Sequence, residues 1–364
     1  MQEVLIIGGG IIGCAIAREL AKEGSQVTLF EAGNQVGREA SGAAIGVLIY
    51  SPTNSNPKAW HSLANQSLLA HRKLRDQLQK ELNPAPEWFW PGRLNAVTSQ
   101  GGEIYSKERL NRDILLTGEG KWLKQEEIHE LEPALGDDVL GGSFTPNQGW
   151  VNPGRLTDAL AESAKQYGVK FEFQAKIEGL ILEGARVVGV RAKGKEIRAK
   201  NIVIAAGAWS GMIDPRVKMP VEPVRGQAIY FDLDKKVPIR HLIQGSGIYM
   251  IPYEQGILIG ATQERVGFDR RNTAGDVIRL IQKGIKILPL LEDVSWEKIH
   301  VRYGFRPGTP DAIPIIGPDR NYKGLFWATG HFKSGILLAP ITATLITQLI
   351  LENKTSELLT SIRN

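Results

Sequence analysis

The first thirty residues alternate between short apolar runs, glycines and a helical repeat. Glu3–Ile7 is a β-branched apolar run, residues 12–23 place apolar side chains at helical spacing, and Gln26–Phe30 is a second apolar run. This order predicts a β-α-β unit, in which a crossover helix joins two parallel strands.

Similar patterns continue along the rest of the chain. Helices are expected at residues 60–82, 125–135, 155–167, 274–288 and 336–351, and strands at 94–97, 169–173, 186–192, 197–204, 227–233, 247–253 and 256–262. Residues 213–305 alternate in strand fashion, which is typical of an antiparallel sheet. We therefore predict an α/β plus α+β fold with two discontinuous domains. A Rossmann-like nucleotide-binding domain takes residues 1–83, 151–212 and 306–364, and a mainly antiparallel-sheet substrate domain takes residues 84–150 and 213–305.

Composition narrows the class of protein. The chain has 364 residues, with 42% hydrophobic and 23% charged side chains, as in an ordinary soluble enzyme. The net charge is +5, but basic residues alternate with acidic ones, so no nucleic-acid partner is expected. The single cysteine, Cys14, excludes an intrachain disulfide and a cysteine metal site, and no histidines fall at ligand spacing, so no metal is expected.

Two apolar stretches raise the question of a membrane. The N-terminal run lacks a basic leader region and is interrupted by glycines, so it does not read as a signal peptide. Residues 336–351 are too few to span a bilayer and include Pro340 and Gln348. We expect a buried helix, no stable membrane insertion and a cytoplasmic protein.

A glycine fingerprint follows the first predicted strand. Gly8 permits the tight turn, Gly10 lets the backbone approach a pyrophosphate, and Gly13 lets helix and strand pack closely. The helix N-terminus offers free amides to phosphates. Glu31 ends the second strand, where its carboxylate can accept hydrogen bonds from an adenosine ribose. Together these features predict dinucleotide binding.

The segment after Glu31 bears on which dinucleotide is bound. Residues 37–46 are nearly all small, with one cation, Arg38. Small residues suit a backbone that lies against a phosphate and a flat ring, which favours a flavin. A surface loop is the alternative interpretation of this segment.

With these pieces placed, the chain resembles the glycine oxidase branch of the D-amino-acid oxidase family of FAD enzymes over nearly its whole length. The motifs that carry the resemblance are the sequences at residues 6–13, Glu31, 41–46, 205–211, 248–252, 306–309 and 330–340. The last three are the more specific to this branch, whereas many flavoproteins share the first.

The resemblance implies a noncovalent FAD, with an FAD-binding domain and a sheet domain that covers the flavin. It implies oxidation of glycine, sarcosine or small D-amino acids to an imine and then an oxo acid, with molecular oxygen reduced to hydrogen peroxide. It also implies a homo-oligomer and a role in thiamine thiazole synthesis. The cofactor-binding positions that we expect are Gly8, Gly10, Ile12, Gly13, Glu31, Arg38, Ser41, Gly42, Ala43, Ala44, Gly46, Ala206, Gly207, Trp209, Gly330, Phe332, Lys333, Gly335 and Ile336.

Three residues are candidates for the substrate site. A guanidinium can hold a carboxylate through two parallel hydrogen bonds, and Arg306 matches the family's carboxylate-binding arginine. Tyr249 matches a tyrosine that bonds the same carboxylate. Two positions depart from the family: Gly247 stands where glycine oxidases can have a histidine, and Lys333 stands where family members have an arginine. A glycine at 247 would either enlarge the pocket or alter the substrate preference. Lys333 is either a weaker carboxylate anchor or flavin contact, or a surface lysine.

Other functions remain open from the sequence. A flavin amino-acid dehydrogenase that passes electrons to a carrier or quinone would have the same fold. A non-catalytic flavin-binding subunit would lack a substrate anchor, so Arg306 and Tyr249 argue against it. A covalent flavin is disfavoured because no cysteine lies near the C-terminal flavin segment, and a nicotinamide dehydrogenase gives that segment no role.

Overall fold

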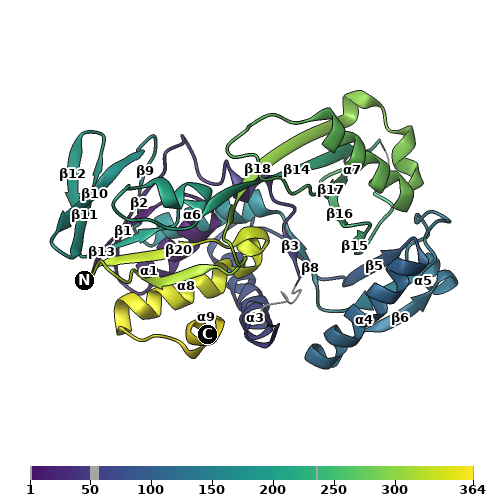
Figure 1. Cartoon of the computed structure of the whole chain (residues 1–364), viewed down its shortest axis with the longest axis horizontal. Coiled ribbons are helices and arrows are strands. Elements are labelled where there is room, and N and C mark those ends of the chain that lie inside the picture. The colour runs from purple at the N-terminus through teal and green to yellow at the C-terminus, as the bar shows by residue number, and fades with distance from the viewer. Residues whose placement is uncertain (1, 50–56, 235–236, 364) are drawn as a thin grey trace.

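The structure is a computed structural model that describes residues 2–49, 57–234 and 237–363. Residues 50–56, which belong to the first segment of the predicted FAD-binding domain, lie outside the described residues. The elements gather into two lobes (Figure 1). One lobe holds the N- and C-terminal elements, and the other holds strands β14–β18 with helix α7 above helices α4 and α5.

The first lobe is built around a mainly parallel sheet with the strand order β19-β20-β13-β1-β2-β9. Only β19 is antiparallel to its neighbour within the described sheet. The strands are β1 (Glu3–Ile7), β2 (Gln26–Phe30), β9 (Lys170–Glu172), β13 (Asn201–Ile204), β19 (Ile315–Pro318) and β20 (Leu325–Thr329). The predicted β-α-β unit is confirmed as β1, α1 (Ile11–Lys22) and β2.

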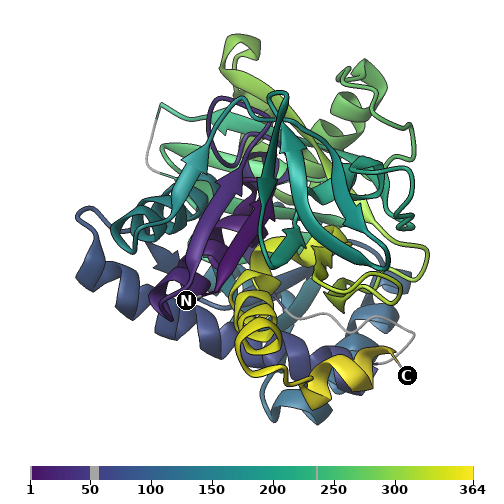
Figure 2. The same cartoon turned by 90° about the vertical axis from the view of Figure 1, so that its left-hand side faces the viewer.

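Both faces of this sheet are covered, which explains why β1 is apolar from Val4 to Ile7. Val4 and Ile6 pack into a core with helices α1, α3 (Pro57–Glu81), α6 (Pro153–Gln166) and α8 (Gly335–Glu352). Leu5 and Ile7 point the other way, as expected for alternate residues of a strand, into a core shared with a second sheet. That sheet contains β10 (Ile177–Glu183), β11 (Arg186–Ala192) and β12 (Lys195–Arg198). Figure 2 shows α8 beside the N-terminal unit, with α9 (Glu357–Arg363) following it.

The second lobe is built around a larger, mainly antiparallel sheet with the order β18-β14-β17-β16-β15-β5-β7-β6. Its strands are β5 (Arg93–Val97), β6 (Lys121–Lys124), β7 (Gly141–Thr145), β14 (Glu222–Asp232), β15 (Leu242–Gly245), β16 (Ile248–Tyr253), β17 (Gly256–Gly260) and β18 (Ile299–Gly308). Helix α7 (Ala274–Ile287) packs on one face against Phe231, Met250 and Ile259. The opposite face, with Ala228, Ile251 and Leu258, turns toward Ile45 of the first lobe.

Two features of the fold differ from the sequence prediction or go beyond it. Residues 197–204 were expected to form one strand, but they divide between β12 and β13, which lie in different sheets. The break between the two strands falls at Ala199 and Lys200, and the sequence does not show it because neither residue is a glycine or proline. Helix α4 (Gln100–Thr117) was not expected. Its apolar residues do not share one buried face, since Ile104 is 66% exposed and Leu115 is 85% exposed.

A small sheet of three short strands links segments of the two lobes. Strand β8 (Gly149–Val151) pairs with β3 (Val47–Leu48) and with β4 (Trp88–Phe89). The remaining helices are α2 (Ala40–Ala43) and α5 (Gln125–Leu131), with 3₁₀ turns at Gly207–Met212, Pro289–Asp293, Trp296–Lys298 and Phe332–Ser334.

One described helical segment, Phe332–Glu352, is long and apolar enough to cross a membrane by length and composition. In the fold, 72% of its apolar window is buried inside the protein. Its apolar residues pack against α1 and α3, as expected for a core helix.

Candidate functional site

A cavity of about 860 Å³ runs between the two lobes, and its wall comes from both of them. Its nucleotide end is formed by the first β-α-β unit. Gly8 has a φ of +111°, which only glycine adopts readily, and it turns the chain from β1 into α1. A Cβ at Gly13 would lie 2.0 Å from the carbonyl oxygen of Gly8, so Gly13 allows the turn to pack against the helix.

The positive end of helix α1 faces this part of the cavity. The first turn contains no acidic residue, and its N-cap residue, Gly10, has no side chain with which to cap it. Glu31 lies beside the turn: its Oε2 accepts a hydrogen bond from the Gly9 amide at 2.7 Å, and its Oε1 accepts one from the Gly33 amide at 2.7 Å. The carboxylate is therefore held in a fixed position at the cavity wall.

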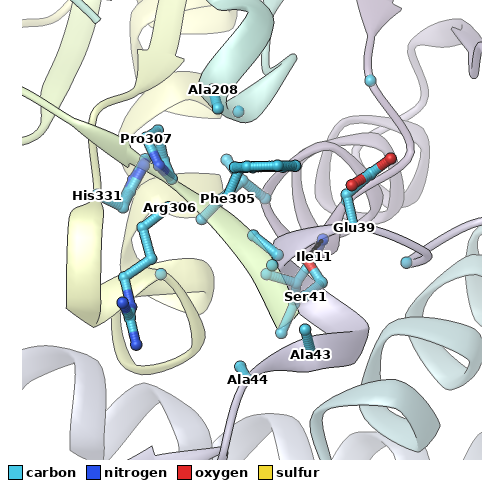
Figure 3. Close-up of a pocket in the computed structure, with 18 of the residues that line it drawn as sticks. Ile11, Glu39, Ser41, Ala43, Ala44, Ala208, Phe305, Arg306, Pro307 and His331 are labelled. Atoms are coloured by element: carbon cyan, nitrogen blue, oxygen red, sulfur yellow. Dashed lines mark hydrogen bonds between the residues drawn. The ribbon is translucent and has the colours of Figure 1, made fainter. Parts of the chain in front are cut away.

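The small-residue segment after Glu31 crosses the front of helix α1. Ser41 Oγ accepts a hydrogen bond from the Ile11 amide at 3.0 Å, which ties α2 to the helix N-terminus (Figure 3). Arg38, Ala43 and Ala44 line the cavity as predicted. Gly42 does not line it: a Cβ there would meet the Gly37 carbonyl oxygen at 2.4 Å, so Gly42 serves the turn behind the wall.

The start of helix α8 forms another part of the wall, through Gly335 and Ile336. Pro340 within this helix has no N–H, so it cannot bond to the carbonyl of Ile336. His71 of α3, which is fully buried, approaches that carbonyl with Nε2 at 3.0 Å and the Leu337 carbonyl at 3.1 Å. Ser67 also donates to the Leu337 carbonyl at 2.6 Å.

These contacts fix the state of His71. Trp88 donates from Nε1 to His71 Nδ1 at 3.2 Å, so Nδ1 must be an acceptor and the proton lies on Nε2. Burial lowers the pKa of His71 to about 4, although the two carbonyls act in the opposite direction. A neutral histidine therefore compensates for the proline at the helix end nearest the cavity.

At the other end of the cavity, Arg306 comes from strand β18. Arg306 and the preceding Phe305 point to opposite sides of the strand (Figure 3). The Arg306 guanidinium lies over Gly226 of β14, where a Cβ would be 2.2 Å from Nη1. Its Nη1 donates to the Thr262 carbonyl oxygen at 2.9 Å. Burial lowers the pKa of Arg306 to about 10, and Glu264 opposes this shift, so the guanidinium stays charged at neutral pH.

Tyr249 approaches the same space from β16, two strands beyond β14 in the sheet. It lies opposite Gly260 on β17, and Gly260 lies opposite Ala228 on β14. Directly paired residues share one face of a sheet. The strands between Arg306 and Tyr249 therefore present only hydrogen atoms or a methyl group, at Gly226, Ala228 and Gly260. This leaves an open space over the sheet between the Arg306 guanidinium and the Tyr249 phenol.

Lys333 also lines the cavity, but its side chain is more exposed than that of Arg306. Desolvation and the nearby Arg306 lower the pKa of Lys333. Its ammonium lies 5.2 Å from the centre of its neighbour's ring, that of Phe332. The substrate end thus carries two neighbouring cations.

Most of the predicted site residues share this one cavity. Those that line it are Gly8, Gly10, Ile12, Glu31, Arg38, Ser41, Ala43, Ala44, Gly46, Ala206, Gly207, Trp209, Tyr249, Arg306, Phe332, Lys333, Gly335 and Ile336. Gly13, Gly42 and Gly330 do not line it. A Cβ at Gly330 would meet Thr309 Cγ2 at 2.6 Å, so this glycine permits a close chain crossing behind the wall.

Several lining residues could not be found from the sequence. They include Gln244, Thr262, Arg270, Phe305 and His331, and residues 175–177 near the nucleotide end. Trp209 stacks on Phe268 with 4.8 Å between ring centres, and Arg270 pairs with Glu39 at 2.8 Å, so the segment between β17 and α7 is fastened to the first lobe. Of these residues, Phe305 adjoins the motif at residues 306–309, and His331 lies within the motif at residues 330–340.

The residues present fit a flavin dinucleotide. The helix N-terminus, whose N-cap residue has no side chain, and the glycine turn suit a pyrophosphate. The Glu31 carboxylate suits a ribose, and the small residues at 43–46 and 206–207 leave room for a flat ring. The cavity volume lies at the upper end of the range for ligand pockets.

Comparison with known proteins agrees with this fit. The family model described as FAD dependent oxidoreductase (DAO) matches residues 3–349. The bifunctional protein ThiO/ThiG of Nostoc sp. is 36% identical over 98% of this chain, and the chain spans 54% of that longer relative. The glycine oxidase of Geobacillus kaustophilus is 31% identical over 97% of this chain and 94% of its own length.

Comparison with solved structures supports the same family. The crystal structure of glycine oxidase from Geobacillus kaustophilus superimposes with a TM-score of 0.90 over 98% of this chain and 96% of that chain, at 28% identity. The expected Rossmann-like and antiparallel-sheet architecture is thereby confirmed, as is FAD as the cofactor. The chain belongs to the DAO family of FAD-dependent oxidoreductases.

Proposed function

We propose that this enzyme oxidises glycine or a related small amine, such as sarcosine or a small D-amino acid. The observation that carries the proposal is the half-buried guanidinium of Arg306 on the wall of the cofactor cavity, across a glycine-lined floor from Tyr249. A planar cation with free donors is suited to a carboxylate, and the glycine-lined floor leaves space beside it for the rest of the amine.

The protein's contribution to the chemistry is positioning. Bound FAD would supply the two-electron acceptor for the α-hydrogen of the amine, transferred as hydride, with molecular oxygen as the final acceptor and hydrogen peroxide as its product. Arg306 and Tyr249 would hold the carboxylate and so direct the α-carbon. The amine loses two electrons and its α-hydrogen to become an imine, which water hydrolyses to an oxo acid and ammonia.

The expected residues of the FAD site remain part of this proposal. Helix α1 and the glycine turn would bind the pyrophosphate, Glu31 the ribose, and residues 43–46 and 206–209 the ring system. The first turn of α8 would place a helix N-terminus beside the flavin, where a positive end stabilises the anionic reduced ring. The domain bounds given above also remain predictions.

We further propose a cytoplasmic homo-oligomer whose product serves thiamine thiazole synthesis. The similarity to proteins named glycine oxidase and ThiO/ThiG supports this role. Expression of the gene in a bacterium that lacks its own glycine oxidase should restore growth without thiamine. Failure to restore growth by a protein active in vitro would contradict the role.

The direct test of activity is product formation in air. Purified protein with glycine, sarcosine or D-alanine should consume oxygen and release peroxide, an oxo acid and, from glycine or D-alanine, ammonia. Substrate oxidation that needs an added dye or quinone would instead indicate a dehydrogenase. Absence of oxidation with any amine and any acceptor would contradict the proposal.

A further inference from the structure

One end of the cavity extends past Tyr249, away from Arg306. Gln244 and Gly247 line this end. Gln244 on β15 is paired with Tyr249 on β16, so both side chains lie on the cavity face of the sheet. The strand order β18-β14-β17-β16-β15 places Gln244 one strand farther from Arg306 than Tyr249. A substrate held by Arg306 would therefore meet Gln244 only through a substituent beyond its glycine core.

A buried ion pair sets the orientation of Gln244. Arg93 of β5 is 1% exposed, and its Nη2 donates to Asp113 Oδ2 at 2.7 Å and to Thr145 Oγ1 at 3.1 Å. Its Nη1 donates to Gln244 Oε1 at 3.4 Å. A guanidinium has only donors, so Gln244 must turn its oxygen toward Arg93. The amide nitrogen, with its two hydrogens, is the end that faces away from Arg93.

A second observation concerns Gly247, in the turn between β15 and β16. A Cβ at this position would lie 3.9 Å from the ammonium nitrogen of Lys283, an exposed residue of α7. No side chain at 247 stands between the cavity and that cation. Lys283 makes no ion pair with any residue that the structure describes.

The positions of the acidic residues along the cavity wall agree with these two observations. The acidic residues that line it, within the described part of the chain, are Glu31 and Glu39, and both belong to the nucleotide end. The end beyond Tyr249 therefore offers an amide donor without a carboxylate in the described cavity wall. Lys283 lies just outside this cavity, in a second pocket that Glu264 and Asp276 also line.

We propose that Gln244, Gly247 and Lys283 form a subsite for an oxygen-bearing group, a carboxylate or carboxamide, at the far end of the amine substrate. This inference rests on the proposed function and narrows its substrate class. Gln244 donates to an oxygen of the distal group, and Lys283 adds a preference for a negative charge. The distal group can be carried by the amine nitrogen or by the α-carbon, and a substrate panel separates the two.

The test compares matched amines that differ at the distal group. Iminodiacetate is paired with N-ethylglycine, and D-aspartate and D-asparagine are paired with D-alanine. For the wild-type protein, we expect kcat/KM to favour the oxygen-bearing member of at least one pair. Gln244→Leu should lower that preference about tenfold, through KM. Lys283→Met should lower the preference in kcat/KM for iminodiacetate and D-aspartate and leave the preference for D-asparagine unchanged.

Two variants on α7 serve as controls. Lys286→Met makes the same charge change as Lys283→Met, and Gln282→Leu the same chemical change as Gln244→Leu, at exposed positions that do not line the cavity. Both should keep the wild-type preference. A wild-type protein without preference, or a Gln244→Leu protein that weakens every amine equally, would overturn the subsite.

A binding measurement separates failure of the subsite from failure of the proposed function. Succinate and propionate carry one carboxylate for Arg306, and only succinate carries a second. Their binding to the holoenzyme is followed by perturbation of the flavin spectrum. Tighter binding of succinate that is lost in Gln244→Leu supports the subsite even if no amine is oxidised. Equal binding of the two acids would contradict it.

Discussion

The two ends of the cavity are built in different ways. The nucleotide end is made mainly of residues from one stretch of the chain, 7–46, in which backbone amides, glycines and the carboxylates of Glu31 and Glu39 form most of the wall. The substrate end is assembled from strands far apart in the sequence, with Gly226, Tyr249 and Arg306 brought together by sheet register. A ligand at the first end is bound mainly by the backbone, and a ligand at the second end by side chains.

This difference separates two kinds of defect. A change at the substrate end should weaken substrate binding and leave the flavin in place. A change at the nucleotide end should weaken the flavin and leave the properties of the remaining holoenzyme nearly normal.

The largest effect is expected from Arg306→Met. It removes the proposed carboxylate anchor, and a hydrogen bond to a charged group is worth roughly 1.5–3 kcal/mol, so KM for glycine should rise about ten- to a hundredfold. The flavin content should not change. Steady-state oxygen uptake measures KM, and Arg320→Met, at an exposed position, is the control. An unchanged KM would remove Arg306 as the anchor.

Gly226→Ala tests the same anchor without removing any charge. The new methyl group would stand within 2.4 Å of the guanidinium carbon, so the Arg306 side chain must move. Small displacements of a positioning group are costly, and we expect kcat/KM to fall roughly tenfold. Gly101→Ala, at a site with no atom within 4 Å, should have no effect on kcat/KM. Wild-type kinetics in Gly226→Ala would mean that the position of the guanidinium does not matter.

Glu31→Gln tests the nucleotide end. The side-chain amide cannot accept from both the Gly9 and Gly33 amides, because one of its ends is a donor. FAD affinity should fall about tenfold, as measured by titration of the apoprotein with FAD. KM for glycine in the saturated holoenzyme should stay within about twofold of the wild-type value. Unchanged FAD affinity would contradict the role of Glu31, and Glu23→Gln is the exposed control.

The last prediction concerns how the free energy of unfolding depends on pH. The pKa of His71 is lowered by burial from 6.5 to about 4, so the neutral form is favoured in the folded state. Its contribution to the free energy of unfolding is complete above pH 6.5 and is lost as the pH falls toward 4, at roughly 1.4 kcal/mol per pH unit. His71→Gln should make the pH dependence in this window shallower. Denaturant unfolding at pH 7, 6 and 5 measures this, and parallel curves for the two proteins would contradict it.

The nucleotide end could be predicted from the sequence because its residues act through local geometry. Gly8, Gly10 and Glu31 belong to one β-α-β unit, and their spacing alone fixes their relative positions. Arg306 and Tyr249 were found through family resemblance, and no pattern in the sequence shows that they face each other.

The rest depended on contacts that the sequence does not display. Gly226 matters because Arg306 lies over it, and this follows from the pairing of β14 with β18. Gln244 is oriented by Arg93, from a strand about 150 residues earlier in the chain. His71 compensates for Pro340 only because α3 packs against α8. Helix α4 was missed since its apolar residues do not form one face.

The most direct test of the central claim is an anaerobic visible spectrum of the purified holoenzyme before and after addition of glycine. The account places a carboxylate anchor in the same cavity as FAD, so glycine should bleach the flavin band without any acceptor present. Arg306→Met should need a much higher glycine concentration for the same bleaching. A wild-type protein that retains FAD and stays fully oxidised with glycine, sarcosine and D-alanine would contradict the account.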